Sequence, residues 1–155
     1  MRKPIENRFI LVTNAKESNV KLLLTFTIDW LSNHGMEEDR AAGMKCAVCE
    51  ALSNVIDHAY DENFTANSIE VDAVIYKDGT VKVAVRDEGK GISDINVATE
   101  TFFTTGDPEK HSGMGFTTMR AFVDRVKVRS EVGKGTNVLL FHTLTKTSAA
   151  NVLER

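Results

Sequence analysis

Apolar residues recur along the first part of the chain with two different spacings, and each spacing predicts one kind of element. Residues 6–13 contain the short apolar run from Phe9 to Val12, which predicts a first strand. Two helical patterns follow. Ser18 is a candidate N-cap for a helix that ends near residue 33, before Gly35, and a longer helix begins at the acidic residues 37–39 and continues to about residue 60.

The second part of the chain is dominated by strand patterns. Residues 69–75 and 81–85 alternate apolar and polar positions, and the turn at residues 77–80 joins them into a hairpin. A long segment, 92–112, has no clear period, and a loop of that length in a small domain is usually functional. A helix at 116–123 and strands at 126–128 and 137–142, with a turn at 133–135 between them, complete the chain. Early helices followed by hairpin-connected strands predict an α+β fold, a two-layer α/β sandwich, rather than a doubly wound sheet.

Length, composition and charge then limit the class of protein. The 155 residues, 42% of them apolar, are enough for one domain with a proper core, which we place at residues 1–145 with a flexible tail at 146–155. A formal net charge of -3 gives no global reason to bind nucleic acid or an anionic membrane. Residues 22–31 are too short and too polar to span a bilayer, and residues 1–20 mix charges, so we expect a cytoplasmic protein with no signal peptide.

Cys46 and Cys49 form a C-x-x-C inside the second predicted helix. A redox pair normally lies at a helix start, where the dipole lowers the thiol pKa, and no second Cys or His pair is spaced to complete a zinc site. The sequence therefore predicts two buried, inert thiols.

Three polar motifs carry candidate chemistry, and each also has an ordinary structural explanation. Glu50 and Asn54 stand one turn apart on the second helix, which also fits a solvated helix face. Asp87 to Gly91 form a D-x-G-x-G after a strand, where a carboxylate can accept a hydrogen bond from an exocyclic amine and glycines admit a flat ring, although a plain turn has the same composition. Residues 112–116 place a G-x-G at a helix start, where free amides can bind phosphate oxygens.

The order of these motifs, with Gly135 and Thr136 leading the last strand, resembles the GHKL ATPases, whose ATP-binding domain has the Bergerat fold with a mostly antiparallel mixed sheet. The stretches E-A-L-S-N, R-D-E-G-K-G-I, F-T-T and S-G-M-G-F-T-T-M, followed by F-V-D-R-V, are most similar to the anti-sigma factor serine kinases, in particular the anti-sigma F factors of sporulating bacteria. The resemblance implies ATP or ADP and Mg²⁺ as ligands, a sigma factor as partner, an anti-anti-sigma (STAS) protein as substrate, and a homodimer.

The resemblance also implies roles for individual residues. Glu50 would be the general base toward the substrate serine, and Asn54 would coordinate Mg²⁺. Asp87 would bind the adenine amino group with water-mediated support from Thr136. Other residues would contact the nucleotide or the sigma factor: Gly89 and Gly91 at the base, Lys110, His111, Gly113, Met114 and Gly115 at the phosphates, and Lys21 at the sigma interface, where a solvated lysine is the competing explanation.

One departure from the family pattern leaves a second function open. The anti-sigma F factors usually carry a lysine after F-T-T and an arginine before S-G-M-G-F, whereas this chain has Gly106 and His111. The alternative is a nucleotide-gated binding module with little kinase activity. A third hypothesis is the stand-alone catalytic domain of a sensor histidine kinase. We favour it less, because we expect no helix pair before the fold that could carry the phosphorylated histidine.

Overall fold

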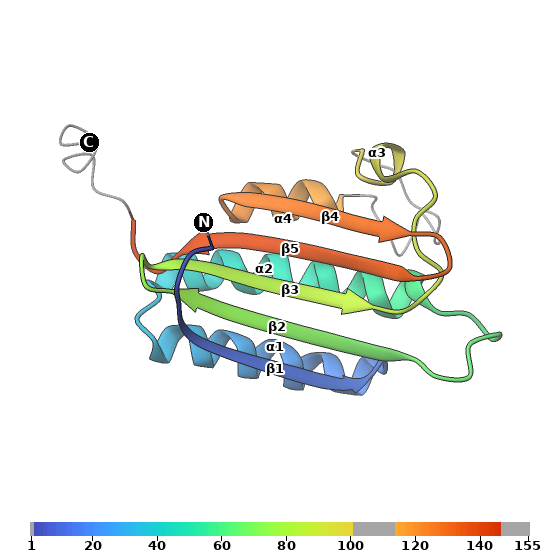
Figure 1. Cartoon of the computed structure of the whole chain (residues 1–155), viewed down its shortest axis with the longest axis horizontal. Helices are drawn as coiled ribbons and strands as arrows, with labels where there is room; N and C mark the ends of the chain where they lie inside the picture. The colour runs from blue at the N-terminus through green and yellow to red at the C-terminus, as the bar shows by residue number, and fades with distance from the viewer. Residues whose placement is uncertain (1, 101–113, 147–155) are drawn as a thin grey trace.

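The computed structural model describes residues 2–100 and 114–146, which form a sheet covered on one side by helices (Figure 1). The elements follow in the order β1 (Ile5–Asn14), α1 (Glu17–Asn33), α2 (Glu38–Asn54), the π-helical turn η1 (Val55–Ala59), β2 (Ser68–Tyr76), β3 (Thr80–Asp87), α3 (Ile95–Ala98), α4 (Gly115–Phe122), β4 (Arg125–Glu131) and β5 (Gly135–Thr143).

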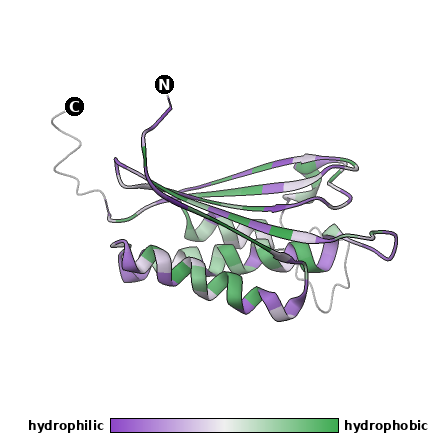
Figure 2. Ribbon diagram, turned by 60° about the horizontal axis from the view of Figure 1, so that its bottom comes forward, coloured by the Kyte–Doolittle hydropathy of each residue, from purple (hydrophilic) through white to green (hydrophobic). Residues whose placement is uncertain are grey.

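The five-stranded sheet has the order β1-β2-β3-β5-β4. All four strand pairings within the described residues are antiparallel, so the mostly antiparallel α+β sandwich is confirmed, and the described strands contain no parallel pair of the kind a mixed sheet would have. The helices α1, α2 and α4 all cover the same face of the sheet, and no helix of the described residues covers the opposite face (Figure 2).

The core lies between α2 and the helix-facing side of β2, β3 and β5. Met44, Val48 and Leu52 on α2 are fully buried there, as are Val71 and Val83 on the sheet. Each of these strands places every second residue on this side, which is the alternation that the sequence shows. Helix α4 packs so closely on α2 that a Cβ at Gly43 would lie 2.6 Å from the carbonyl oxygen of Phe122.

The structure corrects one local prediction about the helices and adds a detail to another. Ser18 does not cap α1, because the helix already begins at Glu17 after a tight turn in which the Asn19 side chain donates to the Asn14 carbonyl, 3.0 Å away. The second helix ends near residue 60 as predicted, but its last turn, η1, is π-helical rather than α-helical, and such turns are frequent at functional sites.

The predicted burial of the two thiols is also wrong. Cys46 is exposed and Cys49 is half-buried, and both are free. The sheet-facing positions of α2 include Ala47 and Val48, which leaves the cysteines on the outer side of the helix.

No helix in the described part of the chain, residues 2–100 and 114–146, is both long and apolar enough to cross a membrane. Lys146, the first residue of the predicted tail, pairs with Asp39 at the start of α2, and residues 147–155 lie outside the described structure.

Gly43→Ala tests the close contact between α2 and α4. Helix propensity alone favours alanine by about 1 kcal/mol, but the added Cβ would force the backbone of Phe122 to move. We expect a net loss of about 1–3 kcal/mol in the free energy of unfolding, measured by urea denaturation. Lys45→Ala, at an exposed position on α2, is the control and should change stability little. An increase in stability for Gly43→Ala would show that the two helices are not in tight contact.

Candidate functional site

A cavity of about 790 Å³ opens at the end of the sheet where β3 finishes and β5 begins. The last turn of α2 and η1 form one wall, and residues 90–98 with the start of α4 form another. Its lining combines apolar and polar residues: Val55, Val85, Ile92, Val97, Phe116, Val132 and Val138 among the former, and Glu50, Asn54, Asp57, His58, Asp87, Lys90, Asp94 and Thr136 among the latter. This mixture is typical of small-molecule sites.

Asp87, the last residue of β3, is the buried polar group of the cavity, with only 6% of its surface exposed. Its Oδ1 accepts hydrogen bonds from the backbone N–H of Gly89, at 2.9 Å, and of Thr136, at 3.3 Å. Among the described residues no donor reaches Oδ2. Burial raises the pKa of Asp87, and the two backbone donors partly oppose that shift. The carboxylate is therefore held in one orientation with one acceptor oxygen left for a ligand.

Close backbone packing around Asp87 explains two glycines. A Cβ at Gly135, where φ is +101°, would lie 2.1 Å from the Asp87 carbonyl oxygen, and a Cβ at Gly89 would lie 2.1 Å from the carbonyl oxygen of Ala59. Gly89 is therefore needed for packing against η1, and it does not line the cavity, whereas Gly91 does.

Tyr60 and Ser130 support the loop that follows Asp87. The Tyr60 hydroxyl donates to the Ser68 carbonyl at 2.7 Å and accepts from the backbone N–H of Glu88 at 2.9 Å, so it joins the end of η1 to two strands. The Ser130 hydroxyl accepts from the backbone N–H of Ile92 and lies 2.8 Å from the hydroxyl of Thr136. Sequence reasoning missed both residues, because no motif marks a single hydroxyl that is used for support.

Glu50 and Asn54 meet the start of α4 at the other end of the cavity. A Cβ at Gly115 would lie 3.2 Å from Glu50 Oε2 and 3.6 Å from both terminal atoms of the Asn54 side chain. The two side chains therefore converge on the first residue of α4, where backbone N–H groups have no intrahelical partner. The solvated helix face, which was the competing explanation for this pair, is wrong, since both residues are half-buried and line the cavity.

For the other predicted site residues, the structure shows only their position or does not describe them. Met114 directly precedes α4, and Lys21 is exposed on α1. Gly106, Lys110, His111 and Gly113 lie outside the described residues.

Comparison with known proteins agrees with this geometry. Residues 13–141 match the model of the histidine kinase-like ATPase domain. The chain belongs to the histidine kinase-like ATPase family.

Relatives within this ATPase family share most of the chain. The anti-sigma F factor of Geobacillus kaustophilus is 37% identical over 94% of this chain and 98% of its own length. That of Clostridium acetobutylicum is 35% identical over 88% of this chain and 93% of its own length. The chain is thus a member of the anti-sigma F factor family among the histidine kinase-like ATPases.

Solved structures share the fold of this ATPase domain. The crystal structure of the RsbU and RsbW domains of a Mycobacterium tuberculosis protein superposes with a TM-score of 0.68 at 19% identity, over 92% of this chain and 34% of that one. This chain therefore spans about a third of that longer protein. The catalytic domain of the histidine kinase ThkA superposes with a TM-score of 0.54 at 18% identity, over 88% of this chain and 97% of that one.

Asp87→Asn should make the nucleotide-free protein more stable at neutral pH. Because burial raises the folded-state pKa of Asp87, the folded protein binds the proton more tightly, and stability falls as pH rises from the unfolded value near 3.8 through the folded value. Asparagine keeps an acceptor for Gly89 and Thr136 without the buried charge. We expect a higher melting temperature at pH 7, with the difference shrinking below pH 4, as measured by circular dichroism.

Asp78→Asn is the matched control, because its pKa shift has the opposite sign. Lys3 and Thr80 lower the pKa of the exposed Asp78 to about 2, so its ionised form stabilises the fold above the unfolded value and that stabilisation is lost as pH falls toward 2. Asp78→Asn should therefore slightly lower the melting temperature at pH 7. At each pH the melting temperature of the parent is subtracted from that of Asp87→Asn. If this difference were smaller at pH 7 than at pH 4, Asp87 would not be a buried charge that costs stability.

Proposed function

We propose that the protein is an anti-sigma regulatory factor that binds ATP with Mg²⁺ in this cavity, phosphorylates a serine of an anti-anti-sigma protein and sequesters a sigma factor. The observation that carries the proposal is the placement of Glu50 and Asn54 against the start of α4, in the same cavity as the buried Asp87. The names of the anti-sigma F factor relatives support a sigma factor as partner, and the anti-anti-sigma serine as substrate rests on the resemblance of the sequence motifs.

The residues present fit an adenine nucleotide. Asp87 offers Oδ2 as an acceptor at the apolar end of the cavity, and an exocyclic amine is a donor that this oxygen can bind. Val85 and Val138 line the same end and provide apolar contact for a flat ring.

The opposite end of the cavity fits phosphates and a hard cation. The amide oxygen of Asn54 is of the type that Mg²⁺ accepts as a ligand, and the amino end of α4 favours anionic oxygens. Bound Mg·ATP would supply the transferable phosphoryl group and the positive charge that offsets its oxygens.

Glu50 is the candidate general base. Its carboxylate lies beside Gly115 at the start of α4, whereas Asp87, the residue that would select the base, lies at the end of β3. A serine hydroxyl is a poor nucleophile, and a carboxylate positioned to accept its proton assists attack. Binding of nucleotide and removal of this proton thus depend on different side chains.

The first test concerns nucleotide binding. In Asp87→Asn the side-chain oxygen stays with Gly89 and Thr136, and an NH₂ group, which only donates, takes the place of Oδ2. An exocyclic amine then has no acceptor there, so ATP should bind more weakly by about 1.5–3 kcal/mol, or roughly 10- to 150-fold in Kd, by calorimetry. Because the same variant should be more stable without nucleotide, weaker binding cannot be attributed to loss of fold. Unchanged affinity would remove the adenine assignment.

The second test separates the kinase from a nucleotide-gated binding module. Glu50→Gln keeps the shape of the side chain, so ATP affinity and sigma binding should persist while transfer of labelled phosphate to an anti-anti-sigma serine slows by roughly 10²–10⁴-fold. Asn54→Ala is the companion variant: it should abolish the Mg²⁺-dependent tightening of ATP binding that EDTA reverses in the parent. If the parent transfers no phosphate and Glu50→Gln behaves like it, the module is the correct account.

A further inference from the structure

The sheet face that the helices leave uncovered carries a group of cations on its β4 side. Arg125, Lys127 and Arg129 occupy alternate positions of β4, Arg86 lies on β3, and all four are exposed. We call these four residues the basic face.

Strand alternation puts them on the open side of the sheet. Val126 and Val128 pack against the core, so the residues between and beside them point the other way. Arg86 and Arg129 both pair with Asn137 of β5, from its two sides, and so share one row across the sheet. The basic face thus comprises residues of β3 and β4, on either side of β5, and lies away from the nucleotide cavity on the helical side.

Within the described part of the chain, Glu70 of β2 stands directly opposite Arg86 in the strand register without forming an ion pair with it, and the three cations of β4 face no acidic residue across β5. No carboxylate in this described part forms an ion pair with Arg86, Lys127 or Arg129, whereas Arg8 and Lys82 on the same sheet face pair with Asp72, at 2.8 and 3.5 Å. The two acids at the ends of β4 have other partners: Asp124 pairs with Arg40 and His142, and Glu131 pairs with Lys134.

The basic face stands out because the chain as a whole is acidic. With a formal net charge of -3, acidic residues outnumber basic ones overall, so the basic face is a local reversal of the general sign. Like charges that lie close together on one sheet face repel each other, and the binding of an anionic partner would reduce this repulsion.

Two features favour an extended acidic protein segment as that partner. β4 is an edge strand, which can pair with a further strand, and its three cations recur every second residue, about 6.6 Å apart. Carboxylates at alternate positions of an extended segment have the same repeat. Nucleic acid is disfavoured because the Arg125 guanidinium covers the Phe141 ring, 4.3 Å from its centroid, which removes the aromatic surface on which a base could stack.

We propose that the basic face docks an extended acidic segment of a partner protein alongside β4. This docking is separate from the nucleotide cavity and does not depend on kinase activity.

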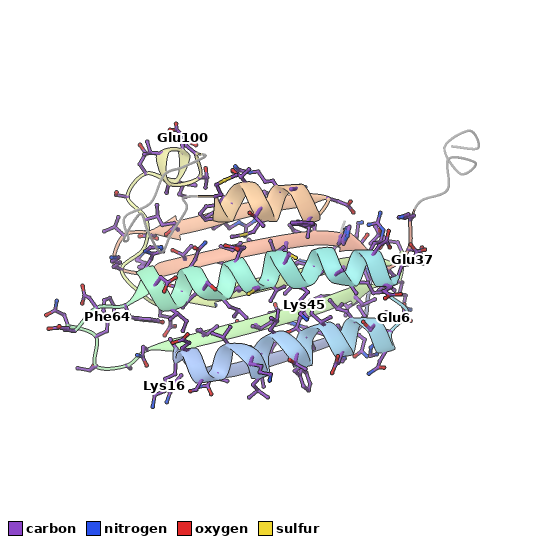
Figure 3. All side chains as sticks on the ribbon, turned by 180° about the vertical axis from the view of Figure 1, so that it is seen from behind. Glu6, Lys16, Glu37, Lys45, Phe64 and Glu100 are labelled. Atoms are coloured by element: carbon purple, nitrogen blue, oxygen red, sulfur yellow. The ribbon has the colours of Figure 1, made fainter. Side chains whose placement is uncertain are left out.

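A labelled peptide of alternating Glu and Thr, twelve residues long, tests the proposal by fluorescence anisotropy with the whole protein. The parent should bind it at low salt, and Lys127→Glu with Arg129→Glu should weaken binding by roughly tenfold or more. The double change to Gln should give a smaller loss, since it removes charge without adding repulsion. The control, Lys45→Glu with Lys77→Glu, makes the same change in net charge at exposed positions outside the basic face, one of them on the helical side (Figure 3), and should change Kd less than about threefold.

Four results would overturn the proposal. The first is no peptide binding by the parent, and the second is an equal loss in the control variant, which would show only a net-charge effect. The third is equal binding of a block peptide with the same composition, which would exclude the extended alternating register. The fourth is tighter binding of a twelve-nucleotide oligo-dT that the Lys127 and Arg129 variants abolish, which would make this a nucleic-acid surface. ATP binding by every variant, measured in parallel, confirms that each one is folded.

Discussion

The buried carboxylate of Asp87 is the constraint around which this end of the fold is built. An ionised group with 6% exposure is costly unless it has donors, and here both internal donors are backbone amides, from Gly89 and Thr136. To bring those amides to one oxygen, β5 must begin against the end of β3, which only a glycine at position 135 allows. Burial of this carboxylate lowers the stability of the fold, and it occurs at the position where a ligand can bind the second oxygen, Oδ2.

The helical layer meets the same constraint from the other side. Because the loop after Asp87 packs on Ala59, the chain after Asn54 must bring that carbonyl close to Gly89, and it does so as a π-helical turn. The backbone N–H of Lys90 then donates to the Ala59 carbonyl at 2.8 Å. A change of helix type at the end of α2 therefore leaves Glu50 and Asn54 on a regular α-helix while η1 fits the loop.

Periodicity predicted the elements that are long and that bury one face. The alternating valines of β3 and the apolar face of α2 both bury the residues that the pattern selected. The sequence motifs also identify Glu50, Asn54 and Asp87 as candidate site residues, and the structure brings them into one cavity. The sequence contains no comparable signal for the π-helical turn, which depends on how Ala59 packs, or for Tyr60 and Ser130, whose hydroxyls act through backbone groups distant in sequence. The burial of Cys46 was mispredicted because it was inferred from the general tendency of free cysteines to be buried, whereas position 46 lies outside the apolar face of α2.

The two sides of the sheet are chemically different, and the difference follows from the single helical layer. On the covered side, apolar residues exclude water, and polar groups gather where the cavity opens, with Thr27 and His142 as buried polar residues elsewhere on this side. On the open side, long side chains replace a helical layer: Val74 and Leu139 are buried there although no helix covers them, which requires the surrounding charged and aromatic side chains to lie over the sheet. Arg125 does this by stacking on Phe141, so part of the positive charge on this face also protects the sheet from water. An open sheet of this kind can remain stable without a second helical layer and still present charge to a protein partner, while the nucleotide cavity is shaped independently on the opposite side.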